Sequence, residues 1–303
     1  MFLKDISLTR KQAEILLAAV TLSRSISFVM TKIGLRELDR FTLLGYRFTL
    51  AFILLLPLAW RKLRGIDRKT LLRGMLLGAS YFAICISETT GLKTTDASVA
   101  SFLLNTAIVL VPLFETIIKR RLPNGPIILS TLICMAGVAL LTLKEGSFTL
   151  SRGEIFILLA ALFYASFIIL TDRLSKKEDP LVLGILQVGF VGLYGLVGSL
   201  IFERPIVARS SSTYLALFGL AIICTGFGFT LQPLAQKFTT AERAGLFCAL
   251  GPVGATISGI LLLNENLYLK SLIGMGLILF GMIFINLYDR LNIKVGILDK
   301  KES

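Results

Sequence analysis

The chain contains no histidine, and only 17% of its 303 residues are charged. The missing histidine excludes Ser-His-Asp and Cys-His catalysis, and it excludes zinc and haem sites that use a histidine ligand. The sequence also has no Gly-rich phosphate loop and no cluster of Asp and Glu with metal-ligand spacing. We therefore expect no cofactor and no metal site, and most enzyme classes are poor candidates.

Cysteine is also scarce, with four residues in the whole chain. All four lie inside apolar stretches, where cysteine packs as a small polarizable side chain: Cys85, Cys134, Cys224 and Cys248. Their positions therefore indicate no disulfide framework.

Long apolar runs are the dominant feature of the sequence. Apolar residues make up 55% of the chain and the mean hydropathy is +0.80, which an ordinary soluble domain does not reach. A spanning helix needs about 20 apolar residues, and ten such segments can be drawn: 13–33, 41–60, 71–91, 96–118, 125–143, 153–172, 181–202, 213–236, 241–263 and 269–288. The sequence thus predicts an all-α polytopic membrane protein with ten transmembrane helices, short connections and no soluble domain.

The distribution of positive charge predicts how the chain sits in the bilayer. The net charge is +13, but the basic residues punctuate the apolar runs instead of gathering on one face, so we expect no nucleic-acid partner. With the N-terminus in the cytoplasm, 21 Lys and Arg fall inside and 9 outside. Because this bias sets orientation, we predict a multi-pass protein of the cell membrane with both termini cytoplasmic.

The two halves of the sequence resemble each other. Residues 16–20 resemble residues 158–162, and residues 94–97 resemble residues 239–242, at offsets of 142 and 145. Five spans per half is an odd number, so a second repeat enters the membrane in the opposite direction. We predict two inverted five-helix repeats, residues 1–147 and 148–303. In proteins built this way the substrate site lies near the bilayer midplane between the repeats.

Charged residues within the predicted spans point to candidate functional positions. Each costs about 2.5–3.5 kcal/mol at the bilayer centre, so each is expected to face the protein interior. Glu115 precedes Lys119 by four residues, which favours an ion pair at a helix end. Arg47 and Glu88 have similar estimated depths and are predicted to form a structural ion pair, with proton coupling by Glu88 as the alternative.

Arg24 has no acidic neighbour at its estimated depth. It belongs to a polar stripe with Thr21, Ser27 and Thr31, whose spacing of three and four residues places them on one helix face. An uncompensated guanidinium favours a carboxylate ligand. The prediction is therefore a carboxylate-bearing substrate, while bonding of Arg24 to helix carbonyls or to Glu88 remains the alternative.

Other polar residues at membrane depth either line the same cavity or hold helices together by hydrogen bonds, and the sequence leaves both open. The resulting candidate substrate-binding residues are Arg24, Ser27, Tyr81, Glu88, Asn105, Tyr164, Gln232 and Gln236. Two prolines within predicted helices, Pro112 and Pro252, are candidate hinges or static kinks. The small-residue pair Gly74 and Gly78 predicts close helix packing.

Several short motifs, spread over nearly the whole chain, resemble the drug/metabolite transporter superfamily, specifically its EamA-type members. They are YRF at 46–48, GLKTTDAS at 91–98, VPL at 111–113, KRR at 119–121, QPLAQK at 232–237, AERA at 241–244, GPV at 251–253, LNE at 263–265 and GMG at 274–276. The resemblance implies ten helices in two repeats and ATP-independent movement of small organic solutes, frequently export of amino acids or other metabolites.

The chain departs from this family at two positions. Arg24-Ser25 stands where the family commonly has Trp-Gly, and Glu88 stands where it often has Gln. The expected function is a secondary transporter or facilitator that exports an amino acid or another carboxylate-bearing solute. An exporter of neutral or cationic drugs, and a membrane enzyme acting on a lipid-linked substrate, remain alternatives, and a homodimer stays open.

Overall fold

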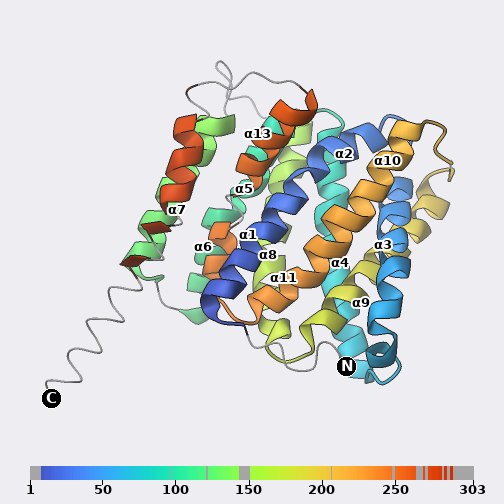
Figure 1. Ribbon diagram of the computed structural model, residues 1–303, viewed down its shortest axis with the longest axis horizontal. Coiled ribbons are helices and arrows are strands. Elements are labelled where there is room, and N and C mark those ends of the chain that lie inside the picture. Colours follow the sequence, from blue (N-terminus) through green and yellow to red (C-terminus); the bar gives the residue numbers. More distant parts are fainter. Residues whose placement is uncertain are drawn as a thin grey trace, which may run out of the picture.

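The computed structural model describes residues 8–95, 97–120, 122–142, 151–205, 207–247 and 250–263, together with 269, 272–281, 283–284 and 287–288. Within these ranges the chain is helical with short connections, and no strand occurs there (Figure 1).

Helices occupy all five spans predicted for the first half of the chain. They are α1 (Arg10–Ser25) with α2 (Ser27–Gly34), α3 (Arg40–Leu63), α4 (Arg68–Leu92), α5 (Ala97–Asn105) with α6 (Ala107–Lys119), and α7 (Gly125–Thr142). The second half contains α8 (Arg152–Ser175), α9 (Pro180–Phe202), α10 (Ser211–Gly219), the π-helix η1 (Leu220–Phe227), α11 (Gly228–Gln236), α12 (Ala241–Phe247), α13 (Leu250–Leu263) and a last apolar helix, Leu272–Gly281.

Six of the described helices are long and apolar enough to cross a membrane. They are Arg10–Gly34, Arg40–Pro57, Arg68–Leu92, Arg152–Ser175, Pro180–Phe202 and Ser211–Gln236. The other predicted spans contain shorter or interrupted helices in the described ranges. The prediction of an all-helical membrane protein is therefore confirmed, and the predicted repeat boundary lies outside the described residues.

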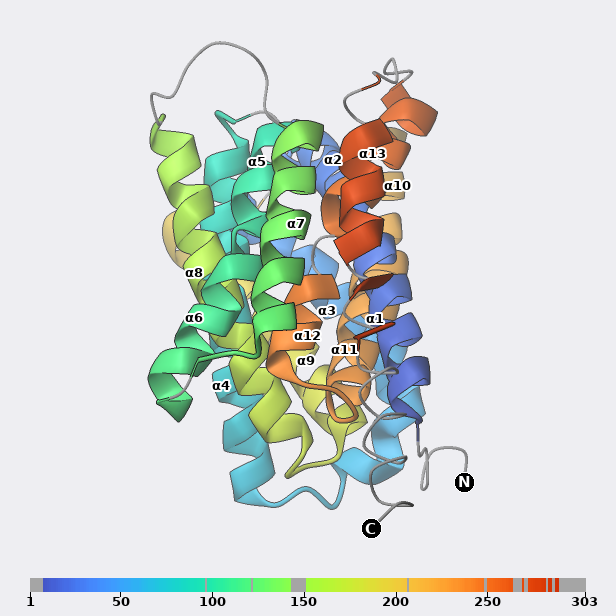
Figure 2. The same ribbon diagram turned by 90° about the vertical axis from the view of Figure 1, so that its left-hand side faces the viewer.

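The two halves enter the bundle from opposite ends. α1 starts at the end where α3 connects to α4, whereas α8 starts at the other end (Figure 2). At the first of these ends, Lys62 bonds Asp179 at 2.6 Å and Arg73 forms an ion pair with Glu178. These contacts tie the α3–α4 region to the α8–α9 connection.

At the opposite end, Glu37 links the segment after α2 to the start of α10. Its Oε2 accepts hydrogen bonds from the backbone N–H groups of Arg209 at 2.8 Å and Ser210 at 3.2 Å. Hydrogen bonds from Ser210 and Arg209 lower the pKa of Glu37 from its usual 4.5 to about 2, because they stabilise the ionised carboxylate.

Local sequence signals explain where several helices begin. Thr9 caps α1 in a capping box with Gln12, and Ser151 caps α8 in the same way with Glu154. The Asp179 carboxylate caps α9, whose first residue is proline, and this order suits a helix start because proline has no N–H to leave unsatisfied.

Helix α9 packs closely on α3 and α4 through glycines. A Cβ on Gly195 would lie 2.5 Å from the backbone nitrogen of Gly45 on α3, so any side chain there would force the helices apart. On α4, Cβ atoms at Gly74 and Gly78 would come within 2.6 Å and 2.7 Å of α9 side chains. The packing role predicted for Gly74 and Gly78 is confirmed.

Three predicted spans are interrupted within the described residues. The first bends at Ile26, the fourth divides at Thr106, and the eighth contains η1. Pro252 lies in α13, and Pro112 lies inside α6, six residues beyond Thr106. Whether either proline acts as a hinge stays a prediction.

Candidate functional site

A polar cavity of about 50 Å³ lies inside the bundle, with room for a few water molecules. Both halves of the chain contribute to its wall. The lining residues are Thr21, Arg24, Ser25, Ser27, Phe28, Thr31, Leu44, Arg47, Tyr81, Cys85, Glu88, Thr89, Leu104, Asn105, Tyr164 and Gly251. The whole predicted stripe of the first span faces this cavity, as its helical spacing indicated.

Arg24, in the last turn of α1, is held by side chains from both halves. Its Nη1 donates hydrogen bonds to Gln232 Oε1 at 2.8 Å and to Tyr164 Oη at 3.2 Å. Its Nη2 donates to Tyr81 Oη at 3.3 Å. The guanidinium carbon also lies 5.7 Å from the Tyr81 ring centre and 5.4 Å from that of Tyr164. These uncharged partners fix the position of the cation and stabilise it through the ring faces.

Gly228 leaves room for the aliphatic part of Arg24. A Cβ at this position would lie 2.8 Å from Arg24 Cγ and 3.1 Å from Cδ, which is too close for carbon atoms. Gly228 lies four residues before Gln232, so both residues face Arg24 from the same side of α11. Gly228 was not among the residues predicted from sequence, although its spacing from Gln232 was a signal that could have identified it.

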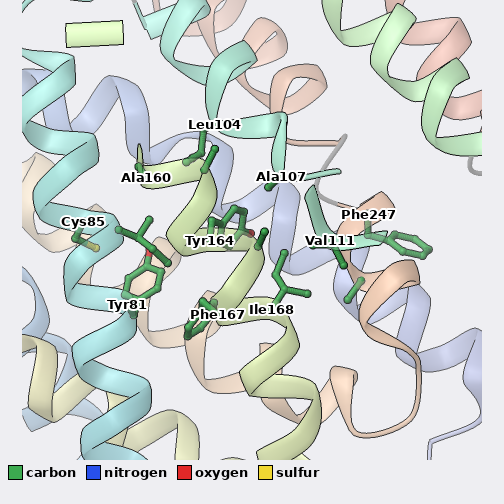
Figure 3. Close-up of a cluster of buried hydrophobic side chains, with 14 of the residues drawn as sticks. Tyr81, Cys85, Leu104, Ala107, Val111, Ala160, Tyr164, Phe167, Ile168 and Phe247 are labelled. Carbon is green, nitrogen blue, oxygen red and sulfur yellow. The ribbon is translucent and has the colours of Figure 1, made fainter. Parts of the chain in front are cut away.

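Aromatic rings pack beside Arg24 between α4 and α8. Tyr81 lies 5.2 Å from Phe167 and 5.9 Å from Phe48, measured between ring centres, and Tyr164 lies 6.4 Å from Phe167. Figure 3 shows Tyr81 on α4 beside Tyr164 and Phe167 on α8. Phe167 follows Tyr164 along α8 toward the α8–α9 connection and packs against both tyrosine rings that line the cavity.

The predicted ion pair between Arg47 and Glu88 is not formed in the structure. Both residues line the cavity, but Arg47 Nε donates to Thr225 Oγ1 at 2.7 Å, and no salt bridge joins Arg47 to Glu88 among the described contacts. Residues at similar depth need not be in contact. Helix α9 packs against both α3, which carries Arg47, and α4, which carries Glu88. Arg47 instead bonds Thr225 of η1. The π-turn of η1 carries no sequence signal that we recognised.

The remaining candidates divide into two groups. Ser27 and Asn105 line the cavity, and Asn105 Nδ2 also donates to the backbone oxygen of Ser101 at 2.7 Å. Gln236 is fully buried away from the cavity, where its Nε2 donates to the backbone oxygen of Ile168 on α8 at 3.5 Å. Gln236 therefore holds two helices together in this structure, which is the alternative that the sequence left open.

Two cavity residues on α4 were not among the sequence candidates. Cys85 and Thr89 follow Tyr81 at intervals of four residues, so all three lie on one helix face. This spacing could have identified them. Leu104 and Gly251 also line the cavity, and nothing in their own sequence context indicates it.

Two buried carboxylates form ion pairs outside the cavity. Glu115 pairs with Lys119 within α6, as predicted. Arg243 Nη1 on α12 lies 2.5 Å from Glu14 Oε1 on α1, and both side chains are buried. The second pair joins the two halves near the start of α1. In the described part of the chain, no three Cys, Asp or Glu residues come together as a potential metal site.

Comparisons with known proteins agree with this architecture. The model of the EamA-like transporter family matches residues 11–143 and 151–287, which is once in each half. An uncharacterized transporter of Archaeoglobus fulgidus is 26% identical over 278 residues, covering 92% of this chain and 87% of the relative. The uncharacterized transporter YoaV of Bacillus subtilis is 25% identical, covering 89% of this chain and 94% of the relative.

A solved crystal structure has a similar fold. It superposes with a TM-score of 0.76 at 18% sequence identity, and the match covers 93% of this chain and 99% of the other. At this identity the likeness concerns the fold alone.

Proposed function

Because the chain belongs to the EamA-like transporter family, whose model matches both of its halves, we propose that it is a secondary transporter for a small carboxylate-bearing solute. The family and the named relatives are transporters and not enzymes, which removes a membrane enzyme from the alternatives. None of those names states a substrate. The substrate class is therefore argued from the chemistry of the cavity.

The observation that carries the proposal is the position of Arg24. Its guanidinium lies on the cavity wall, and its position is fixed by Tyr81 from one half and by Tyr164 and Gln232 from the other. A guanidinium binds a carboxylate with two parallel hydrogen bonds, and the neighbouring tyrosine hydroxyls supply further donors. A solute bound there would contact both repeats at once.

The charge balance of the cavity supports an anionic ligand. Two cationic residues, Arg24 and Arg47, line it beside one carboxylate, that of Glu88. This carboxylate adds a place for the ammonium group of an amino acid, and it is also the residue through which protons would be coupled to transport. An amino acid therefore matches the lining better than a neutral drug does.

Movement of the solute requires the surrounding helices to separate. A cavity of about 50 Å³ admits water molecules but not an amino acid, so the site must widen before it can hold one. The interrupted spans around the cavity supply places where helix halves can change their angles, as in other transporters with broken helices. We assign the direction as export from the cytoplasm, as the resemblance to the family implies.

Counterflow in proteoliposomes tests the substrate class. Purified full-length protein is loaded with one unlabelled amino acid or organic acid at a time, and accumulation of the same labelled solute is measured. Accumulation of at least one carboxylate, with none of matched amines lacking the carboxylate, supports the proposal. Accumulation of amines or neutral drugs alone would favour the drug exporter and contradict it.

A further inference from the structure

A second and much larger cavity lies on the side of the bundle. It is a groove of about 1070 Å³ between α3 and the η1–α11 segment, with Leu181 at the start of α9 among its lining residues. Figure 1 shows α11 and α3 diverging toward the end where α3 connects to α4, with α9 between them. The groove shares no lining residue with the cavity around Arg24.

The walls of the groove are apolar for most of their length. They include Leu54, Leu55, Ile222, Phe227, Leu231 and Leu234. Leu54, Ile222 and Phe227 are 51%, 53% and 43% exposed, so the sides of the groove face the surroundings of the bundle. In a membrane protein those surroundings are acyl chains, and the groove therefore opens sideways into the bilayer.

The length of the groove matches one leaflet. Ala51 and Lys62 on α3 are eleven residues apart, which is about 16 Å along a helix. Half of the hydrocarbon core is about 15 Å thick. An acyl chain lying along α3 would therefore extend from the bilayer surface to about the midplane.

The end of the groove at the bilayer surface is positively charged. Its lining includes Lys62, Lys176, Lys177 and Lys237 against Glu178 and Asp179. Both acidic residues already form ion pairs, Glu178 with Arg73 and Asp179 with Lys62. Lys176 likewise pairs with Asp172. Among the described contacts, Lys177 and Lys237 form no ion pair.

We propose that this groove binds one anionic phospholipid from the leaflet on the side of the α3–α4 connection. One acyl chain lies between α3 and α11 against Leu55, Leu231 and Leu234, and the phosphate contacts Lys177 and Lys237. Lysines at the bilayer surface attract anionic headgroups with about 1 kcal/mol each. The inference depends on the membrane fold and not on the substrate of the Arg24 cavity.

Native mass spectrometry of the purified, delipidated full-length chain tests the headgroup. Dioleoyl-phosphatidylglycerol is added to wild type and to a Lys177→Gln/Lys237→Gln variant, with dioleoyl-phosphatidylcholine as the uncharged comparison. We expect one tightly held phosphatidylglycerol on wild type. Binding to the variant should be weaker by about 25-fold, because two lysines at about fivefold each are removed. The matched control is Lys11→Gln/Lys69→Gln, which removes the same charge at exposed positions of the same end, outside the groove.

Two further experiments test whether the acyl chain contributes to binding. Leu231→Trp narrows the groove and should abolish the tightly bound phosphatidylglycerol, whereas Leu215→Trp at an exposed position of α10 should not. The water-soluble headgroup glycerophosphoglycerol should not compete with the lipid. If Leu231→Trp does not fold, the lysine variants and the competition still decide the outcome.

Three results would overturn the proposal. They are equal retention of both lipids, retention of phosphatidylglycerol that the groove lysines do not affect, and effective competition by the headgroup alone, which indicates a soluble anion. A photoreactive phosphatidylglycerol should label peptides of α3, η1 or α11. Labelling confined to helices that do not line the groove, or no labelling at all, would also contradict the proposal.

Discussion

At the scale of single residues, the central feature is a cation in the middle of a membrane protein that is held by uncharged groups. Placing a charge at this depth is costly, and the hydrogen bonds from Arg24 to Tyr81, Tyr164 and Gln232 offset part of that cost. The same bonds fix its orientation toward the cavity. Under the proposed function, this fixed position pre-organises Arg24 for an anionic group, which limits the entropy lost on binding.

Gly228→Ala tests how closely this arrangement is fitted. The added methyl group would come within 2.8 Å of Arg24 Cγ, so the guanidinium must shift from its partners. We expect transport to fall strongly and the free energy of unfolding to drop by about 1–3 kcal/mol, as for other overpacked sites. Counterflow and thermal unfolding in detergent measure the two effects.

Gly276→Ala is the matched control, because a Cβ at that helical glycine meets nothing within 4 Å. Wild-type transport by Gly228→Ala would show that Arg24 can move freely without loss of function.

Sequence patterns identified Arg24 because a charge within an apolar run is conspicuous and because its stripe has helical spacing. They also singled out Tyr81, Tyr164 and Gln232, but they gave no indication that these three bond Arg24, since the contacts span more than 50 residues of sequence. For Arg47, estimated depth suggested a partner, but depth fixes only one of three coordinates. Contact with Thr225 depends on the path of η1.

At the scale of helices, the two halves meet at buried polar contacts as well as apolar ones. Glu14 on α1 and Arg243 on α12 form an ion pair with side chains only 7% and 4% exposed. Glu14 also lies 3.3 Å from Arg10. The pair lies near the end where α1 starts, so it joins the first and ninth predicted spans on one side of the Arg24 cavity.

Breaking this pair from one side should destabilise the bundle. Arg243→Gln leaves a buried carboxylate without its main partner, and such losses cost about 3–5 kcal/mol. The Glu14→Gln/Arg243→Gln double variant should recover much of the loss, because neither charge is then left unmatched. Thermal unfolding in detergent measures both, and a double variant as unstable as Arg243→Gln would rule out the coupling.

Helix positions were largely predictable, because a run of about 20 apolar residues has few alternatives in a bilayer. The interruptions were not. The bend at Ile26 and the π-helix from Leu220 to Phe227 contain no proline. Ser25 and Ser27 flank the bend and Gly226 lies in the π-helix, but serine and glycine are too common in these spans to mark an interruption by themselves. The glycines through which α9 packs on α3 are present in the sequence, but the sequence does not indicate which helix they pack against.

At the scale of the whole molecule, chain direction and charge distribution together predict the orientation of the protein in the membrane. α1 and α8 start at opposite ends of the bundle, and Lys and Arg are predicted to divide 21 to 9 between the two sides. We therefore expect both termini and the connection at residues 61–69 to be cytoplasmic, and the connection at residues 144–152 to be outside.

Labelling of single cysteines in a cysteine-free background measures this orientation. A cysteine at position 146 should react with a membrane-impermeant reagent in intact cells, whereas one at Gly65 should react only after permeabilisation. The reversed pattern would place the protein upside down and would also reverse the leaflet expected to supply the groove lipid.

Transport by Arg24 variants in proteoliposomes tests the central claim most directly. Arg24→Gln should weaken binding of the carboxylate substrate by on the order of 100-fold while the protein remains folded, because it removes the charged donor of a buried pair. Arg24→Lys should retain part of the activity, because lysine keeps the positive charge but cannot form the bidentate hydrogen bonds of a guanidinium. Arg36→Gln, which removes an exposed arginine after α2, should behave as wild type. Undiminished carboxylate transport by a folded Arg24→Gln protein, or a substrate that proves to be a cation, would contradict the account.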